Sequence, residues 1–376
     1  MITFYQTDCL DGYLAESGLQ SFLDDPQYTE VAVNRPFEIW TENSQGWQKH
    51  DAPKLSKNLS NLIANAFAIF NGTEILTHSP ICSGVLPDGQ RGQVVIPSAC
   101  ERDTVAMTVR RPSDTRFTLN DYFLSDRLSR WFDMSSFKTA NTIVPDFYKK
   151  MIEQEQIQIE RLNRELAIPN GVHLQLFELE MLYAKATRDI KKFIELAVKH
   201  KQNIVLVGAT GSGKTTFTKA VCDIVPTETR IITIEDTAEL TLPHHPNHVH
   251  LFYGADITAK KLIKSCMRMK PDRIFLTELR SDEAYDYINA LNTGHPGSIT
   301  TVHANDCQSA YARVATLIQQ SPIGFNMRKE AILHDVFTTL DVVMFLDHTY
   351  VTEVSYDPVR KYRLQKGKSV LESEQG

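Results

Sequence analysis

The chain has 376 residues, of which 42% are hydrophobic and 23% are charged, and its formal net charge is −6 at pH 7. This length is too great for one ordinary core and predicts two domains, while the composition is that of a soluble globular protein. The acidic balance argues mildly against a nucleic-acid coat.

Local sequence disfavours a membrane-spanning or secreted protein. No apolar run approaches the ~20 residues that a membrane span requires, and the first residues lack the basic start and apolar stretch of a signal peptide. The six cysteines are scattered and include no C-x-x-C pair, so neither a disulfide framework nor a cysteine zinc site is indicated. We therefore expect a cytoplasmic protein.

A small α/β unit without a phosphate loop is predicted between about residues 28 and 111. Its strands are short, Pro36 breaks the first strand region, and Asn71-Gly72 ends its one helix. The expected elements are strand structure over 31–40, a helix over 59–70 and two further strands at 94–96 and 105–109.

A charged amphipathic helix is predicted next, from Pro145 to Ile168, where Pro169-Asn-Gly171 stops it. Such a helix between two domains fits either a plain surface helix or an arm that docks on a neighbouring subunit. A further helix over 189–200 leads into strands and helices that alternate to about residue 346. This alternation predicts a parallel sheet covered on both faces, and the polar residues 351–376 predict an edge strand followed by a frayed tail.

The second region opens with Gly208-Ala-Thr-Gly-Ser-Gly-Lys214-Thr215-Thr216, which fits the phosphate-loop pattern G-x-x-x-x-G-K-[ST]. Residues 203–207 before it predict a buried strand, and residues 217–224 after it predict a helix. A phosphate loop needs this order, because the glycine-rich turn points backbone N–H groups inward and the helix N-terminus adds its positive end. We expect Lys214 to reach the β- and γ-phosphates and the Thr215 hydroxyl to ligate Mg²⁺. The chain is therefore predicted to bind a nucleoside triphosphate.

Carboxylates follow two of the predicted strands. The apolar strand that begins at Ile231 ends in Glu235 and Asp236, and the strand at 274–276 is followed by Glu278. An open α/β sheet binds its ligand at the carboxyl ends of its strands. The pair after the first strand fits either a solvated strand exit or a site that helps to hold Mg²⁺. Glu278 stands where P-loop ATPases place the carboxylate that orients or deprotonates the hydrolytic water.

Histidines occur at two places downstream of the phosphate loop. Gly294 and Gly297 bracket a tight turn with His295, and a short β-rich run then leads to His303. Alone, His303 fits a core histidine, but beside a phosphate site an imidazole can sense the γ-phosphate. Four more histidines lie within residues 244–250. Neither acids nor cysteines crowd them, so we interpret this cluster as ordinary structure rather than a metal site.

Four motifs follow in order: G-A-T-G-S-G-K-T-T, I-E-D-T-A-E-L, R-M-K-P-D-R-I-F-L-T-E-L-R and G-H-P-G-S-I-T-T-V-H-A-N-D. They resemble the Walker A, Asp, Walker B and His boxes of the secretion ATPase superfamily of traffic motors. Within that superfamily the chain is most similar to the hexameric ATPases of type IV secretion and conjugation systems. The resemblance covers about residues 84–346 and is most specific over 203–306. Thr277 departs from the glycine or alanine that is usual there.

The resemblance implies an α/β fold with a RecA-like P-loop ATPase domain at 176–376, preceded by a smaller α/β N-terminal domain at 1–137 and a helical linker at 138–175. It implies ATP and Mg²⁺, with Thr215 and Glu235 at the metal. The implied catalytic residues are Glu278, Glu235 and His303. The implied nucleotide-binding residues are Gly208, Gly211, Ser212, Gly213, Lys214, Thr215, Thr216, Asp236, His295, Arg110 and Arg111.

Arg110 and Arg111 carry two interpretations. As bare sequence, two adjacent arginines before Pro112 fit a solvated loop, because arginine is mostly exposed. In the family that the chain resembles, first-domain arginines close over the nucleotide, and guanidinium groups bind phosphate in a bidentate manner.

The function implied is that of an ATP-hydrolysing hexameric motor that powers substrate transfer or pilus assembly in a type IV secretion or conjugation system. We expect it in the cytoplasm, held peripherally at the inner membrane by components of the secretion apparatus. Two alternatives stay open: a pilus assembly or retraction ATPase or type II secretion motor, and a nucleic-acid-translocating motor on the same RecA-like core. The type II version lacks support because no four-cysteine zinc insertion follows the boxes. Direct nucleic-acid binding is not expected, because the chain is acidic and has no evident aromatic-plus-basic stripe.

Overall fold

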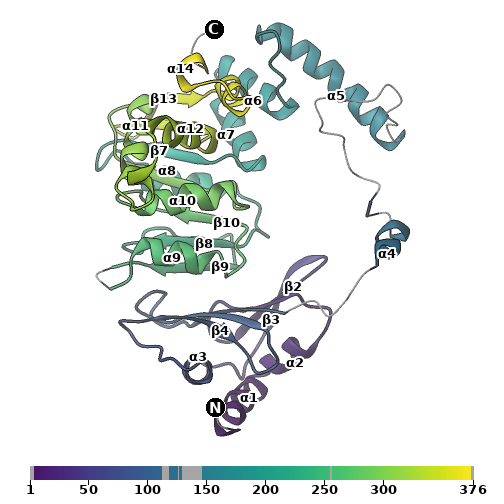
Figure 1. The fold of residues 1–376 in the computed structure, drawn as a ribbon, viewed down its shortest axis with the longest axis vertical. Coiled ribbons are helices and arrows are strands. Elements are labelled where there is room, and N and C mark those ends of the chain that lie inside the picture. The colour runs from purple at the N-terminus through teal and green to yellow at the C-terminus, as the bar shows by residue number, and fades with distance from the viewer. Residues whose placement is uncertain (1–3, 112–117, 126, 129–145, 255, 374–376) are drawn as a thin grey trace.

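A computed structural model describes residues 4–111, 118–125, 127–128, 146–254 and 256–373. The chain forms two sheets, each with its own helices, and the first sheet lies beyond one edge of the second (Figure 1). Among the described residues no helix is both long and apolar enough to cross a membrane.

The first domain is an antiparallel sheet with helices on one face. Its strand order is β3-β2-β1-β6-β5-β4. The elements are α1 (Phe4–Ser17), α2 (Leu19–Asp24), β1 (Glu30–Val33), β2 (Glu38–Asn43), β3 (Gly46–Asp51), α3 (Lys57–Phe70), β4 (Ile81–Val85), β5 (Arg91–Val95) and β6 (Ala106–Arg110). The predicted helix at 59–70 and the break at Pro36 are confirmed. Sequence reasoning missed α1, α2, β3 and β4.

Strand alternation decides which side of this sheet faces the rest of the molecule. Met107 and Val109 of β6 point into the core beneath α1 and α3. Ala106 and Thr108, which alternate with them, point to the second domain, where Ala106 joins that domain's apolar cluster.

Two helices follow the first sheet and precede the second in chain order, α4 (Leu119–Leu124) and α5 (Asp146–Glu165). The predicted charged helix is confirmed, although it ends three residues earlier than Ile168. Leu162 of α5 is buried with Val172, Leu174 and Leu179, so the end of α5 packs on its own chain. The expected boundary between residues 137 and 138 lies outside the described residues.

The second domain is built on a seven-stranded sheet of order β13-β12-β7-β11-β10-β8-β9, parallel except for β13. The predicted parallel sheet is confirmed. Its strands are β7 (Ile204–Val207), β8 (Ile231–Glu235), β9 (His248–Phe252), β10 (Arg273–Leu276), β11 (Ile299–Val302), β12 (Val342–Asp347) and β13 (Tyr350–Tyr356). Its helices are α6 (Leu176–Ala186), α7 (Ile190–Lys199), α8 (Lys214–Cys222), α9 (Ala259–Cys266), α10 (Glu283–Asn292), α11 (Cys307–Gln319), η1 (Gly324–Asn326), α12 (Lys329–Thr339), α13 (Pro358–Gln365) and α14 (Val370–Ser373).

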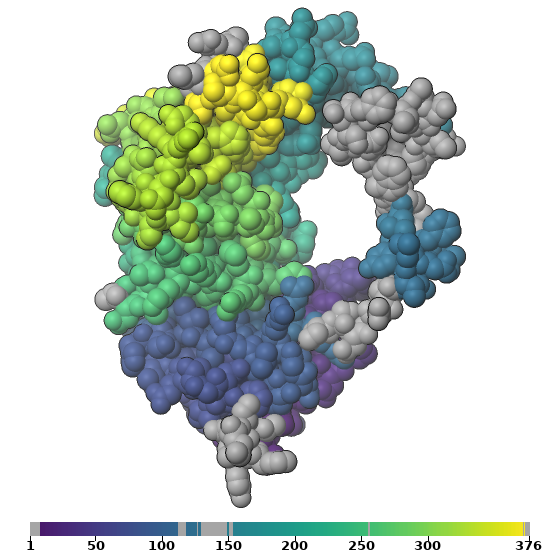
Figure 2. Space-filling model, viewed as in Figure 1, coloured from purple at the N-terminus to yellow at the C-terminus, as the bar shows by residue number. Residues whose placement is uncertain are grey.

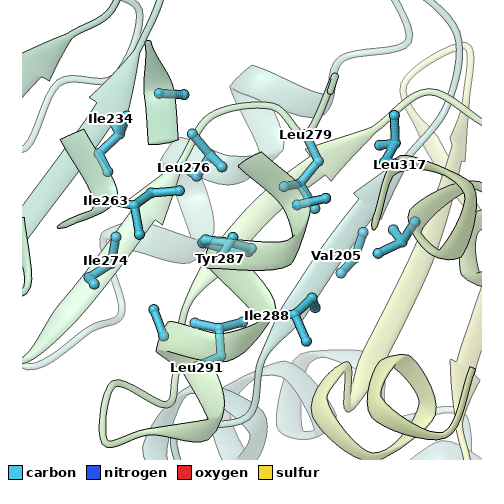
Figure 3. Packing of buried hydrophobic residues seen from close by; sticks show 14 of the residues in the cluster. Val205, Ile234, Ile263, Ile274, Leu276, Leu279, Tyr287, Ile288, Leu291 and Leu317 are labelled. Carbon is cyan, nitrogen blue, oxygen red and sulfur yellow. The ribbon is translucent and has the colours of Figure 1, made fainter. Parts of the chain in front are cut away.

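Helices cover both faces of this sheet. One apolar cluster joins the strands to α9, α10, α11 and α12, and the other joins them to α6, α7 and α8. Figure 3 shows Tyr287, Ile288 and Leu291 of α10 against the strand residues of the first cluster. The near-continuous burial of β7, β8, β10 and β11 is typical of parallel strands packed on both faces.

The C-terminal region corrects one expectation. The edge strand is confirmed as β13, but helices α13 and α14 follow it where a frayed tail was expected. Asp357 caps α13 by accepting a hydrogen bond from the Arg360 backbone N–H, and Pro358 occupies its first turn. The Arg360 guanidinium is buried 4.0 Å from the centre of the Phe337 ring, so packing orders a segment whose composition is polar.

The two domains meet along β9 and at the amino end of β8. Figure 2 shows the first domain packed directly against the second. Arg230, which directly precedes β8, is fully buried and donates to Asn34 and Thr108 of the first domain. Its guanidinium also lies 4.9 Å from the ring centre of Trp47. The first domain therefore sits on the second at a fixed place, far along the sheet from β7.

Candidate active site

The phosphate-loop motif forms a tight turn between β7 and α8. Gly208 has a φ of 152°, and a Cβ there would overlap the Leu346 carbonyl oxygen and the Ser212 hydroxyl. Gly213 has a φ of 86° and caps α8, which begins at Lys214, three residues before the predicted start. These positions need glycine because other residues meet backbone or strain there. The motif thus has the strand, turn and helix order that the sequence predicted.

Polar groups of this loop fit a phosphate chain. The Lys214 Nζ donates to the carbonyl oxygens of Gly208 and Ala209, both at 2.8 Å. Burial lowers the pKa of Lys214, and the charge of Glu278 opposes that change. The Ser212 hydroxyl is buried without a hydrogen-bond partner in the described part of the chain. An ammonium group and an unpaired hydroxyl at the N-terminus of α8 are a donor set that suits phosphate oxygens.

The Thr215 hydroxyl faces a carboxylate that sequence reasoning missed. It donates to Oε2 of Glu239 at 3.0 Å. A threonine hydroxyl and a carboxylate are hard oxygen ligands of the kind that Mg²⁺ takes. Glu239 follows Glu235 by four residues within the Asp box, and this spacing was the available signal.

Glu235 was expected to help hold Mg²⁺, but its carboxylate is enclosed by groups of the protein. Its side chain is fully buried, and its Oε2 accepts from the backbone N–H groups of Glu239 and Leu240 at 3.0 and 2.9 Å. Its Oε1 lies 2.6 Å from the Thr233 hydroxyl and 3.2 Å from His250 Nδ1. Burial raises the pKa of Glu235, but hydrogen bonds led by that of His250 outweigh it and hold the pKa below its ordinary value. Both oxygens are thus engaged within the protein.

Glu278 and Asp236 are bridged by an arginine that was also missed. The Arg280 guanidinium donates to Oε2 of Glu278 at 2.7 Å and to Oδ2 of Asp236 at 2.6 Å. Asp236 follows β8 and Glu278 follows the neighbouring strand β10, so one planar cation spans two strand ends. The Glu278 carboxylate raises the pKa of Arg280, which remains charged. An arginine two residues after a strand-end carboxylate was a signal for such a pair.

His303 joins Glu278 to the phosphate loop. Its Nδ1 lies 3.1 Å from the Gly208 carbonyl oxygen, and its Nε2 lies 3.3 Å from Oε1 of Glu278. Nδ1 must donate to the carbonyl, so the contact with Glu278 is a hydrogen bond when the ring carries its second proton. The structure therefore brings Lys214, Thr215, Glu278, Asp236 and His303 to one edge of the sheet.

Three other expected residues lie elsewhere in the same chain. His295 Nδ1 lies 3.3 Å from the Pro271 carbonyl oxygen, before the amino end of β10. The four-residue strand β11 separates His295 from His303, which places them more than about 13 Å apart. Arg110 pairs with Glu30 at 3.5 Å, and Arg111 donates to the Asp24 carbonyl oxygen at 3.0 Å. Neither arginine is brought to the phosphate loop of its own chain.

The histidines of residues 244–250 differ in their surroundings. His244 is exposed, whereas the Nε2 of His245 lies 3.0 Å from the Val225 carbonyl oxygen. Burial lowers the pKa of His248 to about 4, and its Nε2 lies 2.8 Å from Arg35. Within the described residues, no group of three or more histidine, cysteine, aspartate or glutamate side chains is arranged to hold a metal.

Comparisons with known proteins agree with this geometry. The family model for Type II/IV secretion system proteins matches residues 165–344. The type IV secretion system protein VirB11 of Brucella suis is 38% identical, covering 92% of this chain and 90% of that protein. VirB11 of Bartonella quintana is 34% identical, with coverage of 93% and 94%.

A solved structure extends the likeness to the whole fold. The crystal structure of the VirB11 ATPase from the Brucella suis type IV secretion system, in complex with sulphate, has a TM-score of 0.81 and 37% sequence identity. The match covers 96% of this chain and 98% of that one. The chain therefore belongs to the type II/IV secretion system family and, within it, is an ATPase of the VirB11 type from a type IV secretion system.

Proposed function

We propose that the chain cleaves ATP between the phosphate loop and Glu278, as one subunit of a hexameric ring that drives a type IV secretion apparatus. One observation carries the proposal: His303 touches both the Gly208 carbonyl of the loop and the Glu278 carboxylate. A base, an ammonium group and a loop of backbone donors therefore converge where a triphosphate ends.

Binding requires the chain to exchange partners. Lys214 releases the Gly208 and Ala209 carbonyls and takes phosphate oxygens, with the backbone N–H groups of Gly211, Gly213 and Thr216 and the Ser212 hydroxyl around it. Thr215 and Glu239 would hold Mg²⁺, which when bound neutralises charge on the β- and γ-phosphate oxygens. Glu235 does not contact the metal in this proposal; it positions Glu239 by accepting a hydrogen bond from the Glu239 backbone N–H.

Glu278 orients the attacking water and accepts its proton. In the chain as folded, Arg280 and His303 occupy both carboxylate oxygens. One of these contacts must open for water to reach the carboxylate. Because His303 also contacts the loop, its shift on phosphate binding gives a local signal of the γ-phosphate.

The position of Arg110 supports assembly into a ring. Arg110 lines a cavity of about 470 Å³ with Arg91, Arg268 and Lys270, and the last two precede β10. That is the amino end of the strand, whereas the phosphate loop follows the carboxyl end of a parallel strand. Arg110 or Arg111 can therefore close over nucleotide only on a neighbouring copy, which a closed cyclic assembly supplies at every site.

The partners and location follow from this role. We propose that the ring docks from the cytoplasm on inner-membrane components of the secretion apparatus. Closure of the first-domain arginines around the γ-phosphate, and their release after hydrolysis, is the differential contact that turns ATP turnover into domain movement.

Two substitutions and one sedimentation experiment test the proposal. Glu278→Gln should keep ATP affinity and lose about 10²- to 10⁴-fold in turnover, because it removes the base alone. Lys214→Ala should lose both ATP affinity and turnover. Calorimetry measures the affinity and steady-state kinetics measures the turnover, so the two effects are separated. Analytical ultracentrifugation with a non-hydrolysable ATP analogue should show a ring. Wild-type turnover by Glu278→Gln would remove the base assignment, and a monomer at high concentration would remove the ring.

A further inference from the structure

A row of polar side chains on β8 and β9 runs from the Asp box to the first domain. Glu235 lies at one end of the row and Arg35 at the other. Thr233, His250 and His248 lie between them on one face of the two paired strands. These two histidines belong to the 244–250 cluster, to which the ATPase function gives no role.

The hydrogen bonds at the Glu235 end define the state of His250. The Thr233 hydroxyl lies 2.6 Å from Glu235 Oε1 and 2.7 Å from His250 Nδ1. The hydroxyl has one proton, which goes to the carboxylate, so Nδ1 must carry a proton and donate. His250 thus acts as a donor that fixes the Thr233 and Glu235 side chains together.

The contacts at the other end define the state of His248. Arg35 Nη2 lies 2.8 Å from His248 Nε2, and a guanidinium can only donate, so Nε2 accepts. Nδ1 then carries the proton and donates to the His245 carbonyl oxygen at 2.5 Å. Arg35 itself is held by Glu38 at 3.1 Å and by the Pro246 carbonyl oxygen at 3.2 Å. The rings of His248 and His250 pack with centres 4.7 Å apart.

The row ends at the proposed magnesium site. Glu235 Oε2 accepts from the backbone N–H groups of Glu239 and Leu240, which closes the turn that carries Glu239 to the Thr215 hydroxyl. We propose that His250 is a positioning residue for this site, and that Arg35 of the first domain sets His250 through His248. The first domain then influences the metal side of its own chain's nucleotide site without touching nucleotide. This inference rests on the proposed roles of Thr215 and Glu239.

A purely structural role for His250 predicts a different result. Buried histidines that only fill space change the stability of the fold, and their loss leaves the relative affinity for metal-bound and metal-free nucleotide unchanged. A residue that positions a metal ligand instead changes the affinity for metal-bound nucleotide, by about 10- to 100-fold in comparable metal sites.

The experiment measures the affinity of the full chain for a non-hydrolysable ATP analogue by calorimetry, with Mg²⁺ and with EDTA. The readout is the ratio of the affinity in Mg²⁺ to the affinity in EDTA. His250→Leu should lower this ratio about 10-fold or more and leave the EDTA affinity unchanged. His250→Asn, whose amide can donate from the place of Nδ1, should restore the ratio to within about threefold of wild type. His244→Leu, at the exposed histidine of the same cluster, is the matched control.

Two further variants keep the test decisive. If His250→Leu does not fold, Thr233→Val takes its place in the test. It removes the hydroxyl at nearly constant volume and should lower the ratio. Arg35→Gln should lower it in the same direction, while Lys49→Gln, which also loses a Glu38 contact but does not touch His248, should not. An unchanged ratio in His250→Leu, or in Thr233→Val where His250→Leu does not fold, overturns the positioning role. An unchanged ratio in Arg35→Gln overturns the link to the first domain. A wild-type ratio near one would instead contradict the proposed magnesium site itself.

Discussion

The carboxylates around the phosphate loop each have a protein partner. Glu278 and Asp236 share Arg280, Glu239 faces Thr215, and Glu235 is enclosed by four donors. Exchange of one hydrogen-bond partner for another is nearly neutral in free energy, whereas a buried carboxylate left without a partner costs about 1–3 kcal/mol or more. Nucleotide can therefore enter by exchange, without a large cost in the empty or the filled site.

Glu239 gives a prediction at this scale. Glu239→Gln keeps the shape of the side chain and removes the charge beside Thr215. We expect turnover to fall about 10- to 100-fold at fixed Mg²⁺, with recovery as Mg²⁺ is raised, because the metal loses a charged ligand. Steady-state kinetics against Mg²⁺ concentration measures this. Glu228→Gln, at an exposed position before β8, should behave as wild type. Equal Mg²⁺ dependence in both variants would contradict the role of Glu239.

At the scale of the elements, the pairing of β1 with β6 buries a carboxylate, Glu30, whose charge opposes folding. Glu30 is the first residue of β1, is only 2% exposed and lies opposite Arg110 in the ladder. Burial raises the pKa of Glu30 to about 7, against the smaller opposing effects of Lys270 and Arg110.

The sign of the resulting pH dependence follows from this direction. Below the ordinary pKa of 4.5 Glu30 is protonated in both states and contributes nothing. Between that value and about 7 the unfolded chain ionises first, so the folded state loses stability as pH rises; above about 7 the loss is constant.

Glu30→Gln should remove this loss. We expect the variant to gain stability relative to wild type between pH 5 and pH 8, by roughly 3 kcal/mol at most. Urea unfolding followed by tryptophan fluorescence measures it, because Trp40 and Trp47 lie in the first domain. Glu74→Gln, at an exposed position, is the control. A difference between variant and wild type that stays constant with pH would show that Glu30 is not the group responsible.

For the whole molecule, the docking of the first domain decides where its arginines can act. Arg230, buried between the domains, and the Gln93–Ser265 hydrogen bond of 2.8 Å hold β5 and β6 against the amino end of β8 and against α9. The cross-strand pair Arg91 and Arg110 lines a cavity beside this junction, together with Arg268 and Lys270 of the second domain. Like charges directly opposite on neighbouring strands are destabilising, which is consistent with an anion from outside the chain.

Mixed rings test whether Arg110 acts on a neighbour. Lys214→Ala and Arg110→Ala rings should each have low turnover. In rings assembled from equal amounts of both, roughly a quarter of the sites combine an intact phosphate loop with an intact neighbouring Arg110, and about that share of activity should return. If Arg110 acted within its own chain, mixing would restore nothing. Lys214→Ala mixed with Glu278→Gln is the control, because both substitutions remove groups from the same side of the site.

Much of this architecture was readable in the sequence because its signals are contiguous. The 208–216 loop, the strand-end carboxylates and the breaks at Pro36 and Pro169 are short patterns whose local physics is independent of the rest of the fold. They predicted the parallel sheet, the strand, turn and helix order of the phosphate loop, and the position of Glu278 just after a strand. The first residues lacked a clear pattern, and helices α1 and α2 form there through burial of Leu10, Leu14, Leu19 and Leu23 against the first sheet.

Tertiary structure decided what depends on contacts between distant residues. It placed Glu239 rather than Glu235 beside Thr215, joined Glu278 to Asp236 through Arg280, and separated His295 from His303 by the length of β11. It also set the first domain on β9, far from the phosphate loop of the same chain. Sequence patterns fix which backbone conformations and strand ends occur, since those follow from neighbouring residues. Which side chains meet across strands and domains follows from packing of the whole chain, which no local pattern records.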